Sequence, residues 1–437
     1  MLEQIENLYK LFLQNQTIST DSRNLIPDSI FFSLKGENFN GNEFAVKALD
    51  AGCSLAVIDD EKFKKDNRYF LVDNVLSTLQ QLANYHRKQL NIPIIAITGT
   101  NGKTTSKELL HAVLSQKFKT LSTKGNLNNH IGVPLTLLSI NKSHEIAIIE
   151  MGANHQNEIE VLCRIAEPNF GMITNIGKAH LEGFGGYEGV VKTKNELYQF
   201  IKEKNGFLFV NEDNQLLKKL SEGIKKIIFG TNETYDTIGL FIESNPFVKL
   251  KIKQKNEIVS FADKKTINTK LVGKYNFENI LAAACIGNYF GVSENEIRQG
   301  LENYVPSLNR SQAVQTKNNF LLLDAYNANP SSMKVAIENF AEMDAKNKIL
   351  ILGDMLELGT DTEKEHNSII HLIQSNKFDK IFFVGKYFST ASKKTSAKSF
   401  KNTEEAKQWF NNNLIENSTI LIKGSRGMQL EKLVEFF

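Results

Sequence analysis

The sequence predicts an α/β protein of three domains, with a parallel-sheet, phosphate-binding domain in the centre. The chain has 437 residues, about three times the roughly 150 residues of an ordinary domain. Apolar, β-branched segments alternate with amphipathic ones, which is typical of parallel strands covered by helices. A glycine-rich loop lies between one such strand and a helix. We therefore place three domains, at residues 1–90, 91–305 and 306–437.

Composition and charge limit the class of protein. Hydrophobic residues make up 41% of the chain and charged residues 23%, which is ordinary for a globular protein. A net charge of +3 does not call for a nucleic-acid partner. The apolar runs are far shorter than the roughly 20 residues that span a bilayer, and the amphipathic amino terminus does not resemble a signal peptide. Three scattered cysteines indicate a reducing cytoplasm rather than a disulfide framework or a metal site.

The first block, residues 1–90, is expected to be a small α/β unit. Short apolar runs alternate in it with helical periods. The predicted strands are Ile30–Leu34, Leu55–Ile58 and Tyr69–Val72, and the predicted helices are Phe44–Ala51 and Val75–Leu90. Asn91-Ile92-Pro93 then interrupts the pattern, which places the first boundary near residue 90.

The central block opens with the buried-strand run IIAIT after Pro93. Its predicted strands are Ile94–Thr98, Glu145–Met151 and Gly171–Thr174, and its predicted helices are Lys103–Ser115, His155–Ile165 and Val190–Ile201. The stretch 225–272 alternates polar and apolar residues, which predicts an antiparallel, half-solvated hairpin. An alanine-rich helix at Asn279–Phe290 is expected to close the block.

A third series of strands and helices follows Val305-Pro306. The predicted strands are Phe320–Asp324, Lys348–Gly353, Lys380–Gly385 and Thr419–Gly424, and the predicted helices are 332–343, 363–375, 403–413 and 428–436. This alternation again predicts a parallel sheet covered by helices.

The loop Gly99–Thr105 has the context that a phosphate-binding loop requires. Backbone N–H groups and the dipole of the following helix would converge on the anion, and Lys103 would reach the terminal phosphates. Thr104 could ligate Mg²⁺. Ile97 occupies the first glycine position of the usual GxxxxGK[ST] pattern. A tight strand–helix turn is the simpler alternative, but it gives no reason for a lysine at a helix start, where the dipole opposes it.

Further candidate groups follow other predicted strands. Glu150 ends the second central strand, where a metal ligand or a water-positioning acid belongs, although it could instead cap a helix. His180 follows the next strand and could ligate a divalent cation, or be an ordinary surface histidine. Lys192 and Lys194 lie in the following helical stretch, where lysines are normally solvated.

Loop residues of the last two blocks complete the candidate set. Asn276 and Asn279 stand at the start of the alanine-rich helix and could simply cap it. Arg310 follows Pro306 and could be a hinge salt bridge. Asp324 ends a predicted strand before Tyr326-Asn327-Ala328-Asn329-Pro330 and could be a turn initiator.

Taken together, these motifs resemble the Mur ligases. The matching segments are GTNGKTT, EMGAN, NIGKAHLEGFG, KTKNELY, YNFEN with LAAA, Arg310, DAYNANPSS, GDMLELG and KGSRGMQLE. The phosphate loop and the His180 segment are shared across the superfamily, including the folylpolyglutamate synthases. DAYNANP, GDMLELG and KGSRGM are similar to the branch that adds D-Ala-D-Ala, and the segments 19–23 and 31–38 resemble the nucleotide-sugar domain of that branch. The resemblance covers essentially the full chain, with Asn40-Gly41 standing where Asp-Gly is commoner.

The resemblance implies an ATP-dependent amide ligase of peptidoglycan precursor synthesis. An amino-terminal domain would bind the UDP moiety, a central domain ATP, and a Rossmann-like C-terminal domain would complete the enzyme. ATP would phosphorylate the carboxylate of UDP-N-acetylmuramoyl-tripeptide, and the amine of D-Ala-D-Ala would attack the acyl phosphate. Phosphorylation is needed because a carboxylate is a poor electrophile, and metals and Lys103 can stabilise the developing charge. A cytoplasmic monomer without nucleic-acid partner or stable membrane insertion is expected.

The resemblance also implies roles for single residues. The catalytic residues would be Lys103, Glu150, His180 and Lys194. Two Mg²⁺ ions would be held by Thr104, Glu150, His180 and Lys194, the last carbamylated by CO₂ because it stands four residues before Tyr198. The nucleotide would contact Gly99, Thr100, Asn101, Gly102, Lys103, Thr104, Thr105, Asn276, Asn279, Arg310 and Asp324. The other substrates would contact Thr20, Asp21, Ser22, Arg23, Gly41, Asn327 and Asn329. Because Arg310 and Asp324 lie beyond the central block, domain closure would complete the site.

Three alternatives stay open from the sequence. The first is another amide ligase of the superfamily, among which a folylpolyglutamate synthase fits poorly because it lacks a UDP domain before the phosphate loop. The second is a phosphate-loop kinase, and the third is a nucleotide-binding regulatory module without catalysis. The sequence leaves open whether the third residue of the acceptor peptide is a diaminopimelate-type residue or lysine.

Overall fold

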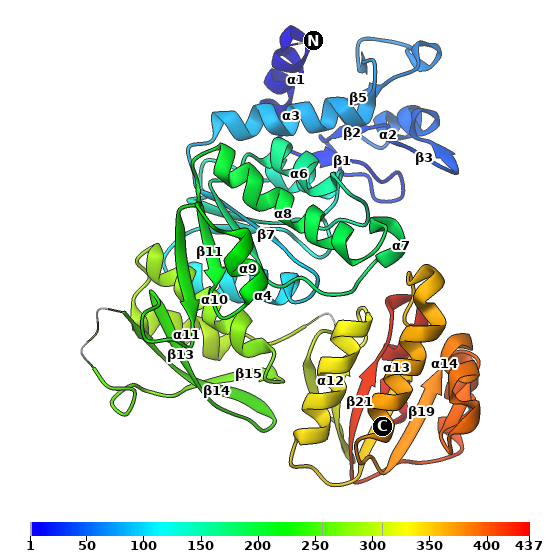
Figure 1. Ribbon diagram of the computed structural model, residues 1–437. Helices are drawn as coiled ribbons and strands as arrows, with labels where there is room; N and C mark the ends of the chain where they lie inside the picture. The colour runs from blue at the N-terminus through cyan, green and yellow to red at the C-terminus, as the bar shows by residue number, and fades with distance from the viewer. Residues whose placement is uncertain (1, 256, 258, 308) are drawn as a thin grey trace.

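The computed structural model describes residues 2–255, 257, 259–307 and 309–437 and contains three successive α/β units (Figure 1). Each unit is built on its own sheet, of four, nine and six strands in chain order. The first unit lies above the central one in Figure 1, and the C-terminal unit lies below it. The predicted three-domain α/β class is therefore confirmed.

The first unit has a four-stranded sheet in the order β1-β2-β5-β6, with all pairs parallel. Its strands are β1 (Ile18–Ser19), β2 (Ile30–Phe32), β5 (Leu55–Ile58) and β6 (Tyr69–Leu71), beside a small hairpin of β3 (Lys35–Gly36) and β4 (Phe39–Asn40). Its helices are α1 (Leu2–Asn15), α2 (Ala45–Asp50) and α3 (Val75–Gln89), with short 3-10 turns at Gly41–Phe44 and Glu61–Phe63. Asn74 caps α3 by accepting from the backbone N–H of Ser77.

The central unit has nine strands in the order β15-β14-β13-β12-β11-β10-β7-β9-β8. These are β7 (Ile94–Thr98), β8 (Thr120–Ser122), β9 (Ile146–Glu150), β10 (Phe170–Ile173), β11 (Phe207–Asn211), β12 (Lys226–Gly230), β13 (Thr237–Ser244), β14 (Phe247–Gln254) and β15 (Ile267–Val272). The helices are α4 (Lys103–Leu114), α5 (Gly132–Leu138), α6 (Glu158–Ala166), α7 (Leu181–Phe184), α8 (Tyr187–Glu203), α9 (Gln215–Leu220), α10 (Asn276–Tyr289) and α11 (Glu294–Asn303).

One prediction for the central sheet is wrong in part. The stretch 225–272 is antiparallel only from β13 onward, because β12 pairs in parallel with β11 and with the first residues of β13. The alternation that suggested a hairpin belongs to β14, where every second side chain is buried. β12 instead adds to the parallel sheet, and its two central residues are only half-buried.

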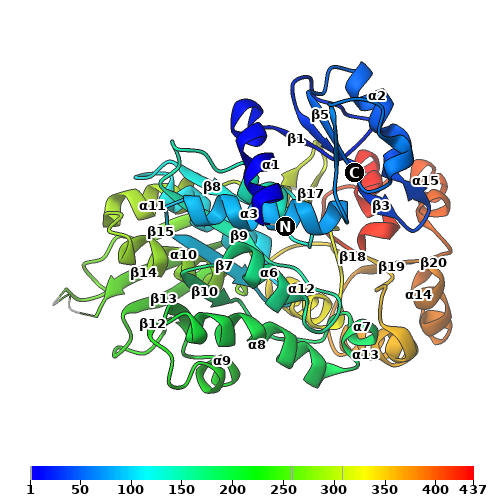
Figure 2. The same ribbon diagram turned by 90° about the horizontal axis from the view of Figure 1, so that it is seen from above.

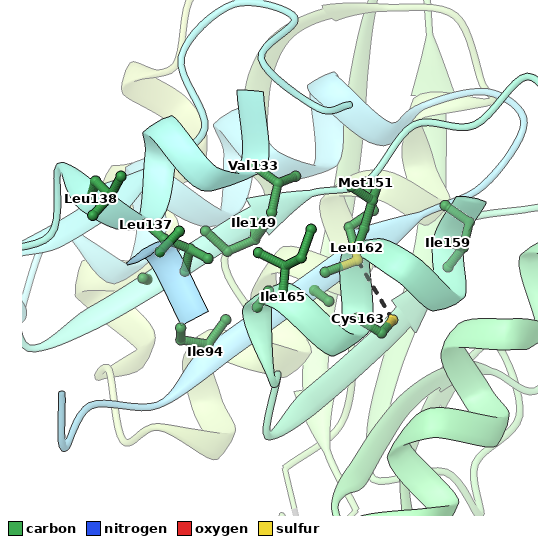
Figure 3. Packing of buried hydrophobic residues seen from close by; sticks show 14 of the residues in the cluster. Ile94, Val133, Leu137, Leu138, Ile149, Met151, Ile159, Leu162, Cys163 and Ile165 are labelled. Carbon is green, nitrogen blue, oxygen red and sulfur yellow. Dashed lines mark hydrogen bonds between the residues drawn. The ribbon is translucent and has the colours of Figure 1, made fainter. Parts of the chain in front are cut away.

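A continuous apolar core ties the first unit to the central one. Side chains of α3 pack with those of α5, α6 and the central strands. Figure 3 shows the part of this core that the central unit supplies, with Val133 of α5 and Ile165 of α6 directed toward Ile149 of β9. The face of β9 that α5 and α6 cover therefore packs in an apolar core, which holds the carboxyl end of the strand in a fixed position.

The C-terminal unit has six strands in the order β16-β17-β21-β18-β19-β20, parallel except for β16. These are β16 (Gln312–Gln315), β17 (Asn319–Asp324), β18 (Lys348–Gly353), β19 (Lys380–Val384), β20 (Lys398–Phe400) and β21 (Ser418–Lys423). The helices are α12 (Pro330–Glu342), α13 (Thr362–Gln374), α14 (Lys386–Ala391) and α15 (Thr403–Asn411), with 3-10 turns at Gly359–Asp361 and Ser392–Lys394.

The predicted helix 428–436 is wrong in type. The chain end forms two 3-10 segments, Arg426–Met428 and Leu430–Phe436. Gln429 between them has a positive φ of 52°, which an α-helix does not accommodate.

Among the described residues, no helix combines the length and the apolar character needed to cross a membrane. The boundaries placed near 90 and 306 fall in the connections between α3 and β7 and between α11 and β16.

Candidate active site

The loop between β7 and α4 has the backbone shape that its glycines permit. Gly99 has φ +144° and Gly102 has φ +78°, both in the region that residues with side chains rarely adopt. A Cβ at Gly99 would lie 2.0 Å from Oγ1 of Thr174, so a side chain has no room there. The loop therefore depends on glycine at both positions.

The segment after β10 holds this loop in place. The backbone N–H of Thr100 donates to the carbonyl of Asn175 at 2.9 Å, and that of Asn101 donates to Oδ1 of Asn175 at 3.0 Å. Oγ1 of Thr174 donates to the carbonyl of Asn101 at 2.6 Å. The loop is thus fixed before any ligand binds.

Lys103 begins α4 and folds back over the loop. Its Nζ donates to the carbonyls of Gly99 at 2.8 Å and Thr100 at 3.1 Å. Desolvation lowers the pKa of Lys103 to about 8, with Arg310 adding to the fall and Glu150 opposing it. A phosphate bound beside this ammonium would stabilise its charged form.

Glu150 ends β9 next to the loop, as the sequence predicts. Its Oε1 accepts from Oγ1 of Thr104 at 3.2 Å and from Nδ2 of Asn128 at 2.8 Å. Its Oε2 is buried without a hydrogen-bond partner among the described residues. Its side chain does not cap a helix, and a buried carboxylate oxygen left free in this way suits a cation.

His180 and Lys194 lie on the same side of the site. His180 precedes α7, and its Nδ1 is in contact with the Glu357 carboxylate of the C-terminal unit. Lys194 of α8 is only 3% exposed, and its Nζ lies 5.4 Å from the centre of the Phe184 ring. Burial, followed by repulsion from Lys103, lowers the pKa of Lys194 to about 7. The described residues contain no ready-made cluster of three His, Cys, Asp or Glu side chains that could hold a metal.

The asparagines at the start of α10 brace the loop rather than cap the helix. Nδ2 of Asn276 donates to the carbonyl of Val272 at 2.8 Å, and Nδ2 of Asn279 donates to Oδ1 of Asn276 at 2.9 Å. Oδ1 of Asn279 accepts from Oγ of Ser106 at 3.0 Å. A Cβ on Gly102 would lie 2.7 Å from Asn279 Oδ1, so this side chain lies directly against the loop.

The C-terminal unit supplies the opposite wall. Arg310 stacks on the Tyr326 ring at 3.6 Å, and its Nε is buried without a hydrogen-bond partner among the described residues. Asp324 at the end of β17 accepts from Nζ of Lys423. Nδ2 of Asn329 donates to Oδ1 of Asn101 at 2.8 Å, so this wall touches the phosphate loop directly.

These two walls enclose a cavity of about 1140 Å³, which is large enough for a sizeable ligand. Most residues predicted from the sequence line it: Thr100, Asn101, Gly102, Lys103, Thr104, Thr105, Glu150, His180, Asn276, Asn279, Arg310, Asp324, Asn327 and Asn329. Gly99, the first residue of the loop, and Lys194, which lies beside His180, are not among its lining residues.

The predicted group in the first unit lies apart from this cavity. Thr20, Asp21, Ser22, Arg23 and Gly41 are not among its lining residues. The Arg23 side chain is 87% exposed and its guanidinium donates to Asp21, and Gly41 packs against the Leu34 carbonyl. A ligand that uses both places must therefore be extended.

Several residues in or beside the site were not predicted. Asn128 holds Glu150 from the loop between β8 and α5, and Tyr326, Lys423 and Glu357 reach the site from the C-terminal unit. The only sequence signal for Asn128 is the asparagine-rich run Asn126–His130, which also reads as an ordinary turn.

Comparison with known proteins agrees with this geometry. The family described as Mur ligase middle domain matches residues 97–287, and the one described as Mur ligase, glutamate ligase domain, matches residues 309–426. The UDP-N-acetylmuramoyl-tripeptide–D-alanyl-D-alanine ligase of Bacillus subtilis is 34% identical over 433 residues, which cover 96% of this chain and 92% of that protein.

Two solved structures have the same fold over almost the whole chain. A crystal structure of MurF from Acinetobacter baumannii has a TM-score of 0.85 at 30% identity, covering 98% of this chain and 97% of that one. The MurF ligase of Thermotoga maritima, in complex with ADP, has a TM-score of 0.83 at 26% identity and covers 97% of each chain.

Proposed function

This chain belongs to the Mur ligase family, and we propose that it joins D-Ala-D-Ala to UDP-N-acetylmuramoyl-tripeptide at the expense of ATP. The observation that carries the proposal is the similarity to a D-alanyl-D-alanine-adding ligase over all three units, including the unit before the phosphate loop. A relative that shared only the ATP-binding centre would leave the substrates open. The product is a precursor of peptidoglycan.

ATP binds in the cavity between the central and C-terminal units. The phosphate loop offers backbone N–H groups and the amino end of α4 to the phosphates. Lys103 exchanges its bonds to the loop carbonyls for a phosphate oxygen, and the Arg310 guanidinium approaches the γ-phosphate from the opposite wall. Asp324 contacts the ribose, and Asn276 and Asn279 hold the side of the loop on which the base lies.

The tripeptide carboxylate attacks the γ-phosphorus of ATP, which forms an acyl phosphate and releases ADP. The amine of D-Ala-D-Ala then attacks the acyl carbon, which forms the amide bond and releases phosphate and a proton. The developing charge on the transferred phosphoryl group is stabilised by Lys103 and Arg310. Asn327 and Asn329 lie beside this point and orient the reacting peptide groups. The distant UDP moiety is bound by the group in the first unit, namely Thr20, Asp21, Ser22, Arg23 and Gly41. These residues therefore contribute to substrate binding rather than to the chemical step.

The donor set fits magnesium, a hard cation that prefers oxygen ligands. Thr104 and Glu150 would hold one ion, because Glu150 Oε2 is buried and has no hydrogen-bond partner in the described part of the chain. His180 and a carbamylated Lys194 would hold a second. When bound, the ions neutralise phosphate charge and stabilise the leaving group.

A phosphate-release assay with UDP-N-acetylmuramoyl-tripeptide, run with and without D-Ala-D-Ala, tests the proposal. We expect turnover only when both substrates are present. Rapid ATP hydrolysis without them would overturn the ligase assignment, and stable transfer of phosphate to an alcohol would favour a kinase. Tight ATP binding without any turnover would favour a regulatory module.

A further inference from the structure

The segment between β10 and α7 touches the C-terminal unit at several points. Nζ of Lys178 donates to Oε1 of Glu365 at 2.9 Å, and the backbone N–H of Lys178 donates to Oγ of Ser331 at 3.0 Å. The Lys178 side chain is 50% exposed, but the Glu365 side chain is only 7% exposed. The carboxylate of α13 is therefore largely removed from water and depends on Lys178 for charge compensation.

The backbones approach closely at the same place. A Cβ on Gly177 would lie 2.8 Å from Oγ of Ser331, and one on Gly359 would lie 3.0 Å from Cβ of Glu182. Figures 1 and 2 both show α7 beside the end of the C-terminal unit that carries α13. This is a fitted contact between two units rather than a lone ion pair on a surface.

The contact leads directly to the phosphate loop. The backbone N–H of Gly177 donates to Oγ1 of Thr100 at 2.9 Å, and Oγ1 of Thr100 donates to the Gly177 carbonyl at 3.2 Å. On the other side, Ser331 lies two residues after Asn329, which bonds to Asn101. One short segment thus connects the loop to the element that follows Asp324.

We propose that Lys178 and Glu365 are positioning residues, whose ion pair fastens the C-terminal unit onto the central unit and so completes the nucleotide site. The inference rests on the proposed function, because it takes the cavity between the two units as the ATP site. Exposed ion pairs contribute little to stability, but in this pair the carboxylate is nearly buried. The pair also connects the central unit with the C-terminal unit, which are built on different sheets. Neither residue lines the cavity, so the pair acts through domain orientation.

Three variants of the pair separate this role from a structural one. Lys178→Met and Glu365→Gln should each raise KM for ATP about 3- to 10-fold while kcat changes less than about twofold. The double variant should be no worse than either single one, because both remove the same interaction. Lys178→Arg should stay within twofold of the wild type. Glu338→Gln is the matched control, because Glu338 pairs with Lys334 within α12 on an exposed surface.

A second readout does not depend on ligase activity. Fluorescent dyes on Lys202→Cys of α8 and Lys386→Cys of α14, both exposed positions, report the distance between the units, and the three native cysteines are buried. In Lys178→Met, energy transfer with ADP bound should be lower than in the parent protein. Unchanged energy transfer and an unchanged KM for ATP would overturn the proposed positioning role of the Lys178–Glu365 pair. Absence of D-Ala-D-Ala-dependent turnover in the wild type would overturn the proposed function alone, since the ADP experiment needs no turnover.

Discussion

Replacing Lys194 tests whether this buried lysine is carbamylated. The side chain is almost completely buried, with the Phe184 ring beside its Nζ and Lys103 as a charged neighbour. An ammonium in such a place is disfavoured. Carbamylation joins the neutral amine to the carbon of CO₂ and releases one proton, so a poorly placed cation becomes an anionic oxygen donor for Mg²⁺.

The size of the effect follows from the pKa of this lysine. A fall from 10.5 to about 7 means that about half of the amines are neutral at pH 7, roughly three orders of magnitude more than for an ordinary lysine. At about 1.4 kcal/mol per pKa unit, the site favours the neutral amine over the ammonium by about 5 kcal/mol more than water does. Burial therefore makes Lys194 reactive toward CO₂ at neutral pH.

Phosphate release by Lys194→Ala, measured with both substrates and bicarbonate, should fall about 100-fold or more, because losing one group that stabilises developing charge costs about that much in kcat. Acetate should restore part of the activity by placing a carboxylate in the space left by the side chain. Lys192→Ala is the control, since Lys192 is exposed on the same helix and should be near wild type.

Carbon-13 NMR with labelled bicarbonate gives an independent readout, since the wild type should show a carbamate signal that the Lys194→Ala protein lacks. Near-normal turnover of Lys194→Ala, or identical spectra of the two proteins, would refute the reasoning.

Further expectations concern the loop, the first unit and pH. Lys103→Ala should lose turnover at least about 1000-fold, whereas Arg23→Ala should mainly raise KM for the UDP substrate; an unchanged KM in steady-state assays would remove Arg23 from that site. In Gly99→Ala the unfolding free energy from urea titration should fall by roughly 2–4 kcal/mol and the affinity for ADP should fall, because the added methyl group meets Thr174 and the φ is unfavourable for alanine. An unchanged ADP affinity would contradict this. In CO₂-free buffer without nucleotide, the folded state loses the Lys194 proton as the pH rises above about 7, whereas the unfolded state keeps it up to about pH 10.5. From pH 7 to 9 the unfolding free energy of the wild type should therefore rise relative to that of Lys194→Met, by at most about 1.4 kcal/mol per pH unit. Parallel plots of unfolding free energy against pH for the two proteins would contradict the lowered pKa.

The sequence was sufficient where a local pattern decides the structure. The strands Leu55–Ile58, Ile94–Thr98 and Lys348–Gly353 have the predicted bounds, since continuous apolar runs between turn residues allow few alternatives. The pairing of β12 was not predictable in this way, because the strand partner lies elsewhere in the chain. The 3-10 form of the chain end depends on a single backbone angle at Gln429.

The residues of the candidate site also divide into those that a local sequence pattern predicts and those that only distant contacts place there. The phosphate loop, Glu150 and Asp324 could be predicted, because each stands at a strand end or in a recognisable motif. Arg310 could be predicted only through the family resemblance. Asn128 and Tyr326 could not, because their roles come from contacts with residues distant in sequence. Asn128 does not differ locally from an ordinary loop residue, and the DAYNANPSS segment that contains Tyr326 does not indicate that its ring stacks on Arg310.

The two walls of the cavity carry complementary unpaired groups. Oε2 of Glu150 on the central wall and Nε of Arg310 on the C-terminal wall are both buried without hydrogen-bond partners among the described residues. Each such atom costs about 1–3 kcal/mol in the free protein, and the two do not satisfy each other. A ligand with anionic oxygens for Arg310 and a bound cation for Glu150 satisfies both at once, which is the composition of a magnesium nucleotide. A magnesium nucleotide that bonds to both groups binds the folded protein and not the unfolded chain, so the unfolding free energy should rise with nucleotide concentration.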